Sequence, residues 1–141
     1  TCGVTMKVSI DVEEGALELM SKGKLDEPVI MLNLLKYLEK AKLGFGVDGL
    51  TGKEAYKVYG KEFAKFQPLY GGEPIWMGRS HNSIIGTDDW DIVILVRYPK
   101  RKNFIGMFQD PKYKAIAPIR AAALKDSRII EMTQLLHKVT N

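Results

Sequence analysis

Three side chains are the best candidates for chemistry: Asn33, His81 and Arg120. Asn33 interrupts an apolar stretch, and a buried amide needs partners, so it is either a satisfied structural residue or a substrate ligand. His81 is either a general base, since a free histidine titrates near pH ~6.5, or a half-exposed strand residue. Arg120 either holds a substrate carboxylate bidentately or pairs with a neighbouring loop. Together they would support proton transfer, with His81 as the base and with Asn33 and Arg120 stabilising negative charge on the substrate.

Three further residues are candidates for ligand binding: Tyr59, Trp76 and Arg97. Tyr59 belongs to an aromatic stripe of helical spacing, which indicates a core residue whose hydroxyl could reach a pocket rim. Trp76 either lines the pocket or packs on a sheet. Arg97, near the end of an apolar strand, has the same two interpretations as Arg120.

The sequence lacks the residue combinations that most other classes of reaction require. Cys2 is the only cysteine, which excludes an internal disulfide, and a zinc site is not expected from two histidines, His81 and His137. No Ser-His-Asp order, paired metal carboxylates or phosphate-binding loop stands out. The Gly-rich stretch 39–52 lacks the dinucleotide fingerprint and indicates a flexible loop. We therefore expect no cofactor.

Composition indicates one globular domain. The chain has 141 residues, of which 45% are hydrophobic and 27% are charged. Its longest apolar run, Ile92–Val96, is far shorter than the ~20 residues of a membrane helix. The pattern of a signal peptide is absent, so we expect a cytoplasmic protein. The net charge of +4 is spread over helical patterns beside acidic residues, which favours a solvated surface over a nucleic-acid interface.

The first half of the chain predicts a helix, a strand and a second helix. Residues 12–22 form a helical pattern that Asp11 caps and Gly23 ends. Residues 28–37 are apolar on both alternating faces, which is typical of a strand covered on both sides. Thr51 and Glu54 make a capping box. The helix that follows carries an aromatic stripe at offsets 0, 3, 7, 10 and 14 and is closed by Pro68 and a glycine pair: Tyr56, Tyr59, Phe63, Phe66 and Tyr70.

The second half predicts a hairpin, two helices and a last strand. Residues 74–85 are predicted to be extended, residues 90–98 are a strand with apolar residues on both faces, and the two flank a polar turn at 86–89. A short helix covers 101–109. A longer one starts with Asp110 as cap, runs to about Lys125 and is disturbed by Pro118. Residues 127–138 complete the pattern as a strand.

This order is the split βαβ pattern of the α+β ferredoxin-like fold, an antiparallel four-stranded sheet with two helices on one face. Residues 1–27 would be an N-terminal arm and helix, and residues 28–138 the ferredoxin-like domain. The strands are apolar on both faces, so the second face needs cover, and a second copy of the chain is the simplest candidate. We expect a homodimer that closes into a dimeric α+β barrel.

Several motifs resemble those of the DUF1330 family of the dimeric α+β barrel superfamily. They are Leu32-Asn33-Leu34, Tyr56 and Tyr59, Pro68-Leu69-Tyr70-Gly71-Gly72, Arg97-Tyr98-Pro99, Asp110-Pro111-Lys112-Tyr113 and Pro118-Ile119-Arg120. The leading helix and residues 39–52 depart from the usual pattern. The resemblance implies the fold and the dimer, and no assigned reaction. Relatives in the superfamily include cofactor-free monooxygenases, haem-dependent enzymes, muconolactone-isomerase-like enzymes and ligand-sensing domains.

Two functions follow as hypotheses. The first is a small cofactor-free enzyme for proton transfer, isomerisation or oxygenation, with His81 as base and Asn33 and Arg120 holding charge. The alternative is a non-catalytic ligand-binding or stress-related module that uses the same cavity. Nucleic-acid binding rests only on the net charge and is not expected, nor is a membrane partner.

Overall fold

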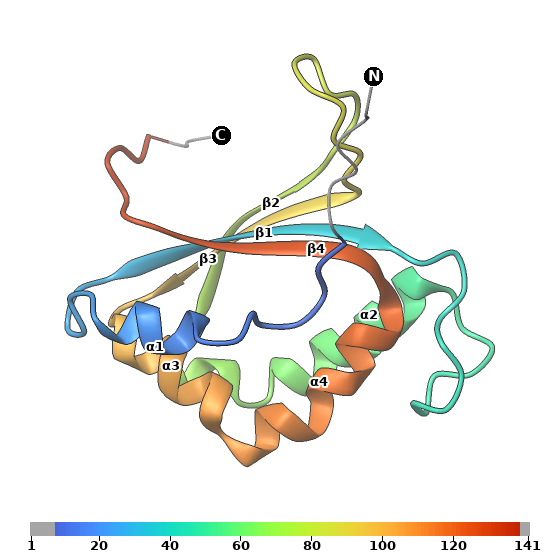
Figure 1. The fold of residues 1–141 in the computed structure, drawn as a ribbon, viewed down its shortest axis with the longest axis horizontal. Coiled ribbons are helices and arrows are strands. Elements are labelled where there is room, and N and C mark those ends of the chain that lie inside the picture. The colour runs from blue at the N-terminus through green and yellow to red at the C-terminus, as the bar shows by residue number, and fades with distance from the viewer. Residues whose placement is uncertain (1–7, 139–141) are drawn as a thin grey trace.

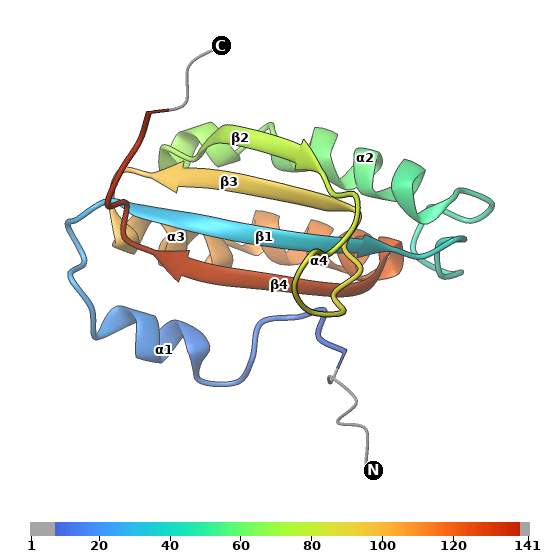
Figure 2. The same ribbon diagram turned by 90° about the horizontal axis from the view of Figure 1, so that it is seen from above.

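A computed structural model describes residues 8–138. Its centre is a four-stranded antiparallel sheet in the order β2-β3-β1-β4 (Figure 2). The strands are β1 (Val29–Tyr37), β2 (Glu73–Arg79), β3 (Ile92–Tyr98) and β4 (Leu124–Met132). The α+β ferredoxin-like class predicted from the sequence is confirmed.

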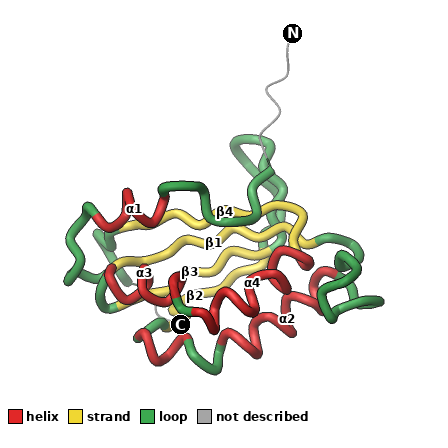
Figure 3. Tube along the Cα trace, turned by 60° about the horizontal axis from the view of Figure 1, so that its bottom comes forward, coloured by secondary structure: helices red, strands yellow, loops and turns green. Residues whose placement is uncertain are grey.

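Helices cover one face of this sheet (Figure 1). They are α2 (Gly52–Phe63), α3 (Arg101–Gln109) and α4 (Pro111–Ala123), and α2 packs against α4. The short helix α1 (Ala16–Ser21) lies beside the edge strand β4, as Figure 3 shows. We call the helix side of the sheet the covered face and the other side the open face.

Local signals place the two main helices as predicted. The Thr51 hydroxyl accepts from the Glu54 N–H at 3.1 Å, and the Glu54 carboxylate accepts from the Thr51 N–H at 2.9 Å, a complete capping box. The Asp110 carboxylate accepts from the Lys112 N–H at 2.8 Å and starts α4. Pro118 lies inside α4, which continues past it to Ala123.

The register of the strands makes two neighbouring rows across the sheet. Met77, Ile94, Asn33 and Ile129 form one row from β2 to β4, which we call the covered row. Trp76, Leu95, Leu32 and Ile130 form the next, which we call the open row. Because side chains alternate along a strand, the two rows point to opposite faces.

The N-terminal helix is shorter than predicted. It begins after Gly15, whose φ is 78°, and Gly15 provides no side-chain cap. Asp11, the expected cap, lies in the irregular segment before it. Only Met20 of this helix is buried, so tertiary packing secures one side chain rather than a full helical face.

The strand predicted over 74–85 ends at Arg79. β3 begins only at Ile92, so residues beyond Arg79 lack a paired strand apart from the bond from the Ser80 N–H to the Asp91 carbonyl at 3.0 Å. His81, expected in mid-strand, therefore lies in the exposed connection between β2 and β3. Similarly, the last strand spans 124–132 rather than 127–138, because its partner β1 starts at Val29.

Two other segments differ from their patterns. α2 ends at Phe63, and the last part of the aromatic stripe continues on a separate 3₁₀ turn, Gln67–Tyr70. The Gly-rich segment 39–52 is anchored rather than simply flexible. Ala41 and Val47 are buried in a cluster with Leu35, and the Ala41 N–H donates to the Leu50 carbonyl at 2.9 Å. Cys2 lies outside the described residues.

Candidate functional site

A cavity of about 270 Å³ lies between the covered face and the helices. All members of the covered row line it, together with Tyr59 and Phe63 of α2. We call it the smaller cavity. Its walls are largely apolar, with a few polar groups among them, which is typical of small-molecule sites.

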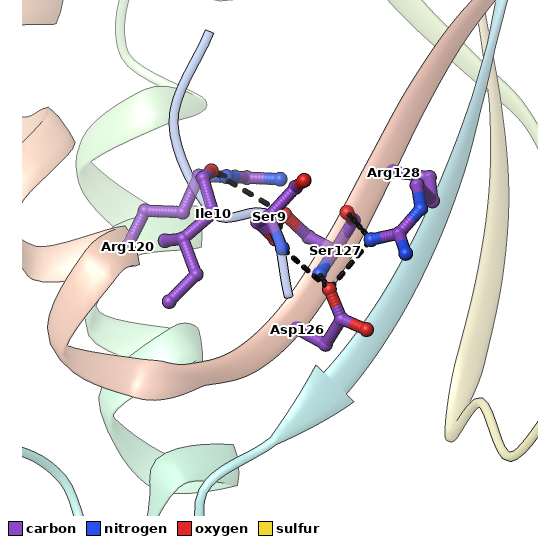
Figure 4. A network of polar contacts seen from close by, with 6 residues as sticks. All are labelled: Ser9, Ile10, Arg120, Asp126, Ser127 and Arg128. Atoms are coloured by element: carbon purple, nitrogen blue, oxygen red, sulfur yellow. Dashed lines mark hydrogen bonds and ion pairs between the residues drawn. The ribbon is translucent and has the colours of Figure 1, made fainter. Parts of the chain in front are cut away.

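Arg120 is the buried cation of this cavity. It lies in the last turn of α4 and is only 7% exposed. Its Nη1 donates to the Ile10 carbonyl at 2.7 Å (Figure 4), while its Nη2 is buried without a hydrogen-bonding partner. Within the described residues no carboxylate forms an ion pair with it. A buried guanidinium without an anion is costly, so the site favours an anionic ligand.

Asn33 provides an acceptor in the middle of the covered row. Its Nδ2 donates to the Met31 carbonyl at 3.1 Å and more weakly to the Ile94 carbonyl at 3.5 Å. These bonds fix the amide, and its oxygen accepts no hydrogen bond from a described residue. The amide oxygen can therefore accept from a hydroxyl or amine of a ligand.

Tyrosines supply the other titratable groups of the smaller cavity. Burial raises the pKa of Tyr59 well above its usual value, neighbouring Tyr113 and Tyr56 raise it further, and Arg120 opposes the rise. Burial likewise raises the pKa of Tyr56 and Tyr113, which Arg120 also opposes. These hydroxyls are neutral at physiological pH and act as hydrogen-bond donors rather than bases.

The structure brings together three of the six predicted site residues. Asn33, Tyr59 and Arg120 line the smaller cavity. Trp76 and Arg97 lie on the open face, where Trp76 is 43% exposed and Arg97 is opposite Glu73. His81 is exposed and lines neither this cavity nor the larger one described next.

Tyr113 is the site residue that the sequence analysis missed. It lies seven residues before Arg120 on α4, a spacing that places both on one helix face. Together with the Asp110 cap, that spacing could have identified it. The contact of Ile10 with Arg120 had no such signal, because it joins segments 110 residues apart.

A second cavity of about 820 Å³, the larger cavity, lies beside the smaller one. Its walls come from the N-terminal segment 9–20, α3, α4 and β4, with Phe45 from the segment 39–52. Arg120 and Tyr113 line both cavities.

Residues 8–138 contain no group of three or more His, Cys, Asp or Glu side chains placed to hold a metal ion. Over the same residues, no helix has the length and apolar character needed to cross a membrane.

Comparisons with known proteins identify relatives of unknown function. Residues 47–133 match the family described as a domain of unknown function, DUF1330. A protein of unknown function from Rhodopseudomonas palustris is 30% identical, with a TM-score of 0.84 over 93% of this chain and 100% of that chain. No curated protein matches the sequence.

More distant structures share the fold alone. A dimeric protein of unknown function with a ferredoxin-like fold from Bacteroides fragilis is 11% identical, with a TM-score of 0.50 over 77% of this chain and 97% of that chain. A hydroxynitrile lyase from Passiflora edulis is 9% identical, with a TM-score of 0.55 over 80% of this chain and 99% of that chain.

Proposed function

This chain belongs to the DUF1330 family, and we propose that it binds a small, partly apolar carboxylate in the smaller cavity. One observation carries the proposal: the Nη2 of Arg120 is buried and unpartnered in a cavity whose other described side chains include no acidic group. A carboxylate there would gain charge-assisted hydrogen bonds and neutralise a buried charge.

The lining also defines the body of the ligand. Ile94, Ile129 and Phe63 would pack against an apolar ring or short chain. The Asn33 amide oxygen would accept a hydrogen bond from a ligand hydroxyl. Hydroxylated aromatic acids combine a carboxylate for Arg120, an apolar ring and a hydroxyl group for Asn33 in a molecule of suitable size.

The experiment is calorimetric titration of the full chain with benzoate and the three hydroxybenzoate isomers. Binding of an acid should be lost in Arg120→Gln, with benzamide as the uncharged control that fails to bind the unaltered chain. Exposed Lys57→Gln on α2 is the matched charge-removing control and should bind normally. Equal binding of benzoate and benzamide would refute the anion site.

Cofactor-free catalysis is the second candidate. It is favoured by the neutral Tyr56 and Tyr113 hydroxyls beside the Arg120 guanidinium, which could donate a proton to a substrate whose growing charge Arg120 stabilises. His81 has no role in this proposal because it does not line the smaller cavity. In a metabolite screen, Tyr56→Phe should then lose turnover while retaining ligand binding. If ligands are recovered unchanged throughout, the non-catalytic function stands.

We also propose that the chain is a homodimer whose two sheets meet at their open faces. The open row is apolar across the whole sheet, and its edge members Trp76 and Ile130 are 43% and 48% exposed in the single chain. The Bacteroides fragilis protein of the same fold is described as dimeric. Native mass spectrometry should give twice the chain mass, and a monomer at micromolar concentration would contradict the proposal.

A further inference from the structure

The larger cavity adds a feature that the proposed function does not use. Its volume of about 820 Å³ is within the ~300–1,000 Å³ of sites for drug-sized ligands, whereas the smaller cavity falls just below that range. A ligand confined to the smaller cavity would leave this volume empty.

The two cavities share part of their lining. Six residues line both of them: Met31, Phe104, Phe108, Tyr113, Arg120 and Ile129. Four of these are apolar side chains: Met31, Phe104, Phe108 and Ile129. Arg120 therefore lies at the junction, where its guanidinium can reach a ligand that occupies either side.

The interior of the larger cavity is apolar. Its lining includes Leu17 and Met20 of α1, Phe108 of α3 and Ala117 of α4. Its charged side chains other than Arg120 are exposed or partly exposed: Asp11, Glu13, Lys114, Arg128 and Glu131. Among them, Glu131 pairs with Arg101, and Lys114 is exposed. Arg120 is thus the buried charge of the larger cavity. An anionic head group would lose its water of hydration on binding and would pair with this guanidinium.

The N-terminal segment orients this guanidinium (Figure 4). The Ser127 N–H donates to the Ser9 carbonyl at 2.7 Å, and the Ser9 N–H donates to the Asp126 carboxylate at 2.9 Å. The next carbonyl, that of Ile10, accepts from Arg120 Nη1. One guanidinium nitrogen is thereby fixed, and Nη2 is left for a ligand.

We infer that the two cavities form one site for an amphiphilic carboxylate, with the carboxylate on Arg120 and a long apolar tail in the larger cavity. The inference rests on the proposed function, because both place an anion on Arg120. It adds that an aliphatic acid such as dodecanoate is a better ligand than benzoate. The ligand class is therefore a carboxylic acid with an aliphatic chain of about a dozen carbons.

The test is titration of the full chain with dodecanoate, octanoate, dodecanol and benzoate, below the micelle-forming concentrations. Dodecanoate should bind at least tenfold more tightly than octanoate, because a longer tail removes more apolar surface from water. Dodecanol, which lacks the charge, should bind at least tenfold more weakly than dodecanoate. Equal affinity for dodecanoate and octanoate would overturn the tail assignment.

Variants distinguish the binding of the apolar tail from the binding of the carboxylate at Arg120. Ala117→Trp fills the larger cavity without touching the smaller one, and should weaken dodecanoate at least tenfold while changing benzoate less than twofold. Ala121→Phe, at a second position that lines only the larger cavity, should act in the same way and serves if the first variant fails to fold. Exposed Lys57→Gln on α2, outside both linings, is the charge-removing control and should change both ligands less than twofold, whereas Lys114→Gln removes a charge of the larger cavity and should weaken dodecanoate far less than Arg120→Gln does.

Each contrary result has a distinct meaning. If both filled variants bind dodecanoate normally, the inference fails while benzoate binding at Arg120 preserves the proposed function. If Lys114→Gln weakens dodecanoate as much as Arg120→Gln does, Arg120 is not the anchor and the inference is overturned. If neither benzoate nor dodecanoate binds the unaltered chain, the proposed function fails and the inference fails with it.

Discussion

The covered row and the open row are adjacent steps of the same strands, yet they differ in chemistry. The covered row has an amide, Asn33, at its centre, and lines a cavity that contains a buried guanidinium. The open row is apolar from Trp76 to Ile130, and no described helix lies over it (Figure 1). One residue of register thus separates a surface suited to a small polar ligand from a surface suited to a protein partner.

Two cations around the open row reinforce this contrast because each forms an ion pair within the chain. Lys36 bonds to Asp89 at 2.6 Å, and Arg128 bonds to Asp126 at 2.5 Å. The Arg128 guanidinium also lies 5.2 Å from the ring centroid of Trp90. On the covered face, by contrast, Arg120 keeps an unpartnered nitrogen. Charges that are already paired within the chain allow the apolar centre of the open face to bind a second protein surface. An unpaired buried charge favours the binding of an anionic ligand.

The largest expected effect is the loss of the dimer in Leu95→Asp. Leu95 is central in the open row, and a carboxylate there would be desolvated between two sheets. The dimer dissociation constant should rise by about 1,000-fold or more, equivalent to about 4 kcal/mol. Leu69→Asp, at a position 76% exposed outside the sheet, is the control and should leave the dimer intact. Sedimentation velocity measures both, and a dimeric Leu95→Asp would remove the proposed interface.

The next effect is a loss of stability in alkali that originates from the covered face. Burial raises the pKa of Tyr59 and Tyr98 above the usual value near 10. The two tyrosines therefore contribute fully to the free energy of unfolding below pH ~10. Above that pH the free energy of unfolding falls by about 1.4 kcal/mol per pH unit for each tyrosine, until the pKa of that tyrosine in the folded state is reached. Urea unfolding between pH 8 and pH 11 should show this decline, and Tyr59→Phe should make it shallower. An unchanged slope in Tyr59→Phe would contradict the assignment.

A smaller effect is expected from exchanging the polarity of the two rows. Asn33→Leu should abolish any preference for the best hydroxybenzoate over benzoate, a loss of about 1 kcal/mol or about fivefold in affinity. It should leave the dimer unchanged. Leu32→Asn, the neighbouring step on the open row, should do the reverse. Calorimetry and sedimentation on both variants measure this, and the same effect from both would mean that the rows are not functionally distinct.

The smallest effect concerns the attachment of the N-terminal segment to β4. Ser127 is buried, and its hydroxyl donates to the Ser9 carbonyl at 3.1 Å and to the Ile10 carbonyl at 3.3 Å. Ser127→Ala should lower the free energy of unfolding by about 1 kcal/mol. Backbone bonding of Ser9 to Ser127 persists, so ligand affinity should change little. Urea denaturation gives the energy, and a loss above about 3 kcal/mol would show that the segment contributes more to the fold than these bonds indicate.

The sequence predicted most of the elements because their signals are local. The capping box of Thr51 and the Asp110 cap fix where α2 and α4 begin, and a continuous apolar run identifies β3. Strand ends were less accurate, since they depend on where a partner strand stops. This is why His81 was expected in a strand and lies in a connection.

The site was predictable only in part for the same reason. Asn33 and Arg120 were identifiable as polar residues in apolar surroundings, but their common cavity depends on β1 and α4 meeting across the core. Trp76 was a candidate either to line the pocket or to pack on the sheet, and the shift in β2 pairing between Pro74 and Trp76 places it on the open row. A register shift of this kind has no clear signal in one sequence.

The most direct test is a crystal structure of the full chain soaked with 4-iodobenzoate, using the anomalous signal of iodine to locate the ligand. We expect iodine in the smaller cavity, the carboxylate within hydrogen-bonding distance of Arg120 Nη2, and the open faces of two copies in contact. Iodine bound at the open row, or a saturating soak that leaves the smaller cavity without ligand, would contradict the assignment of ligand and partner to opposite faces of the sheet.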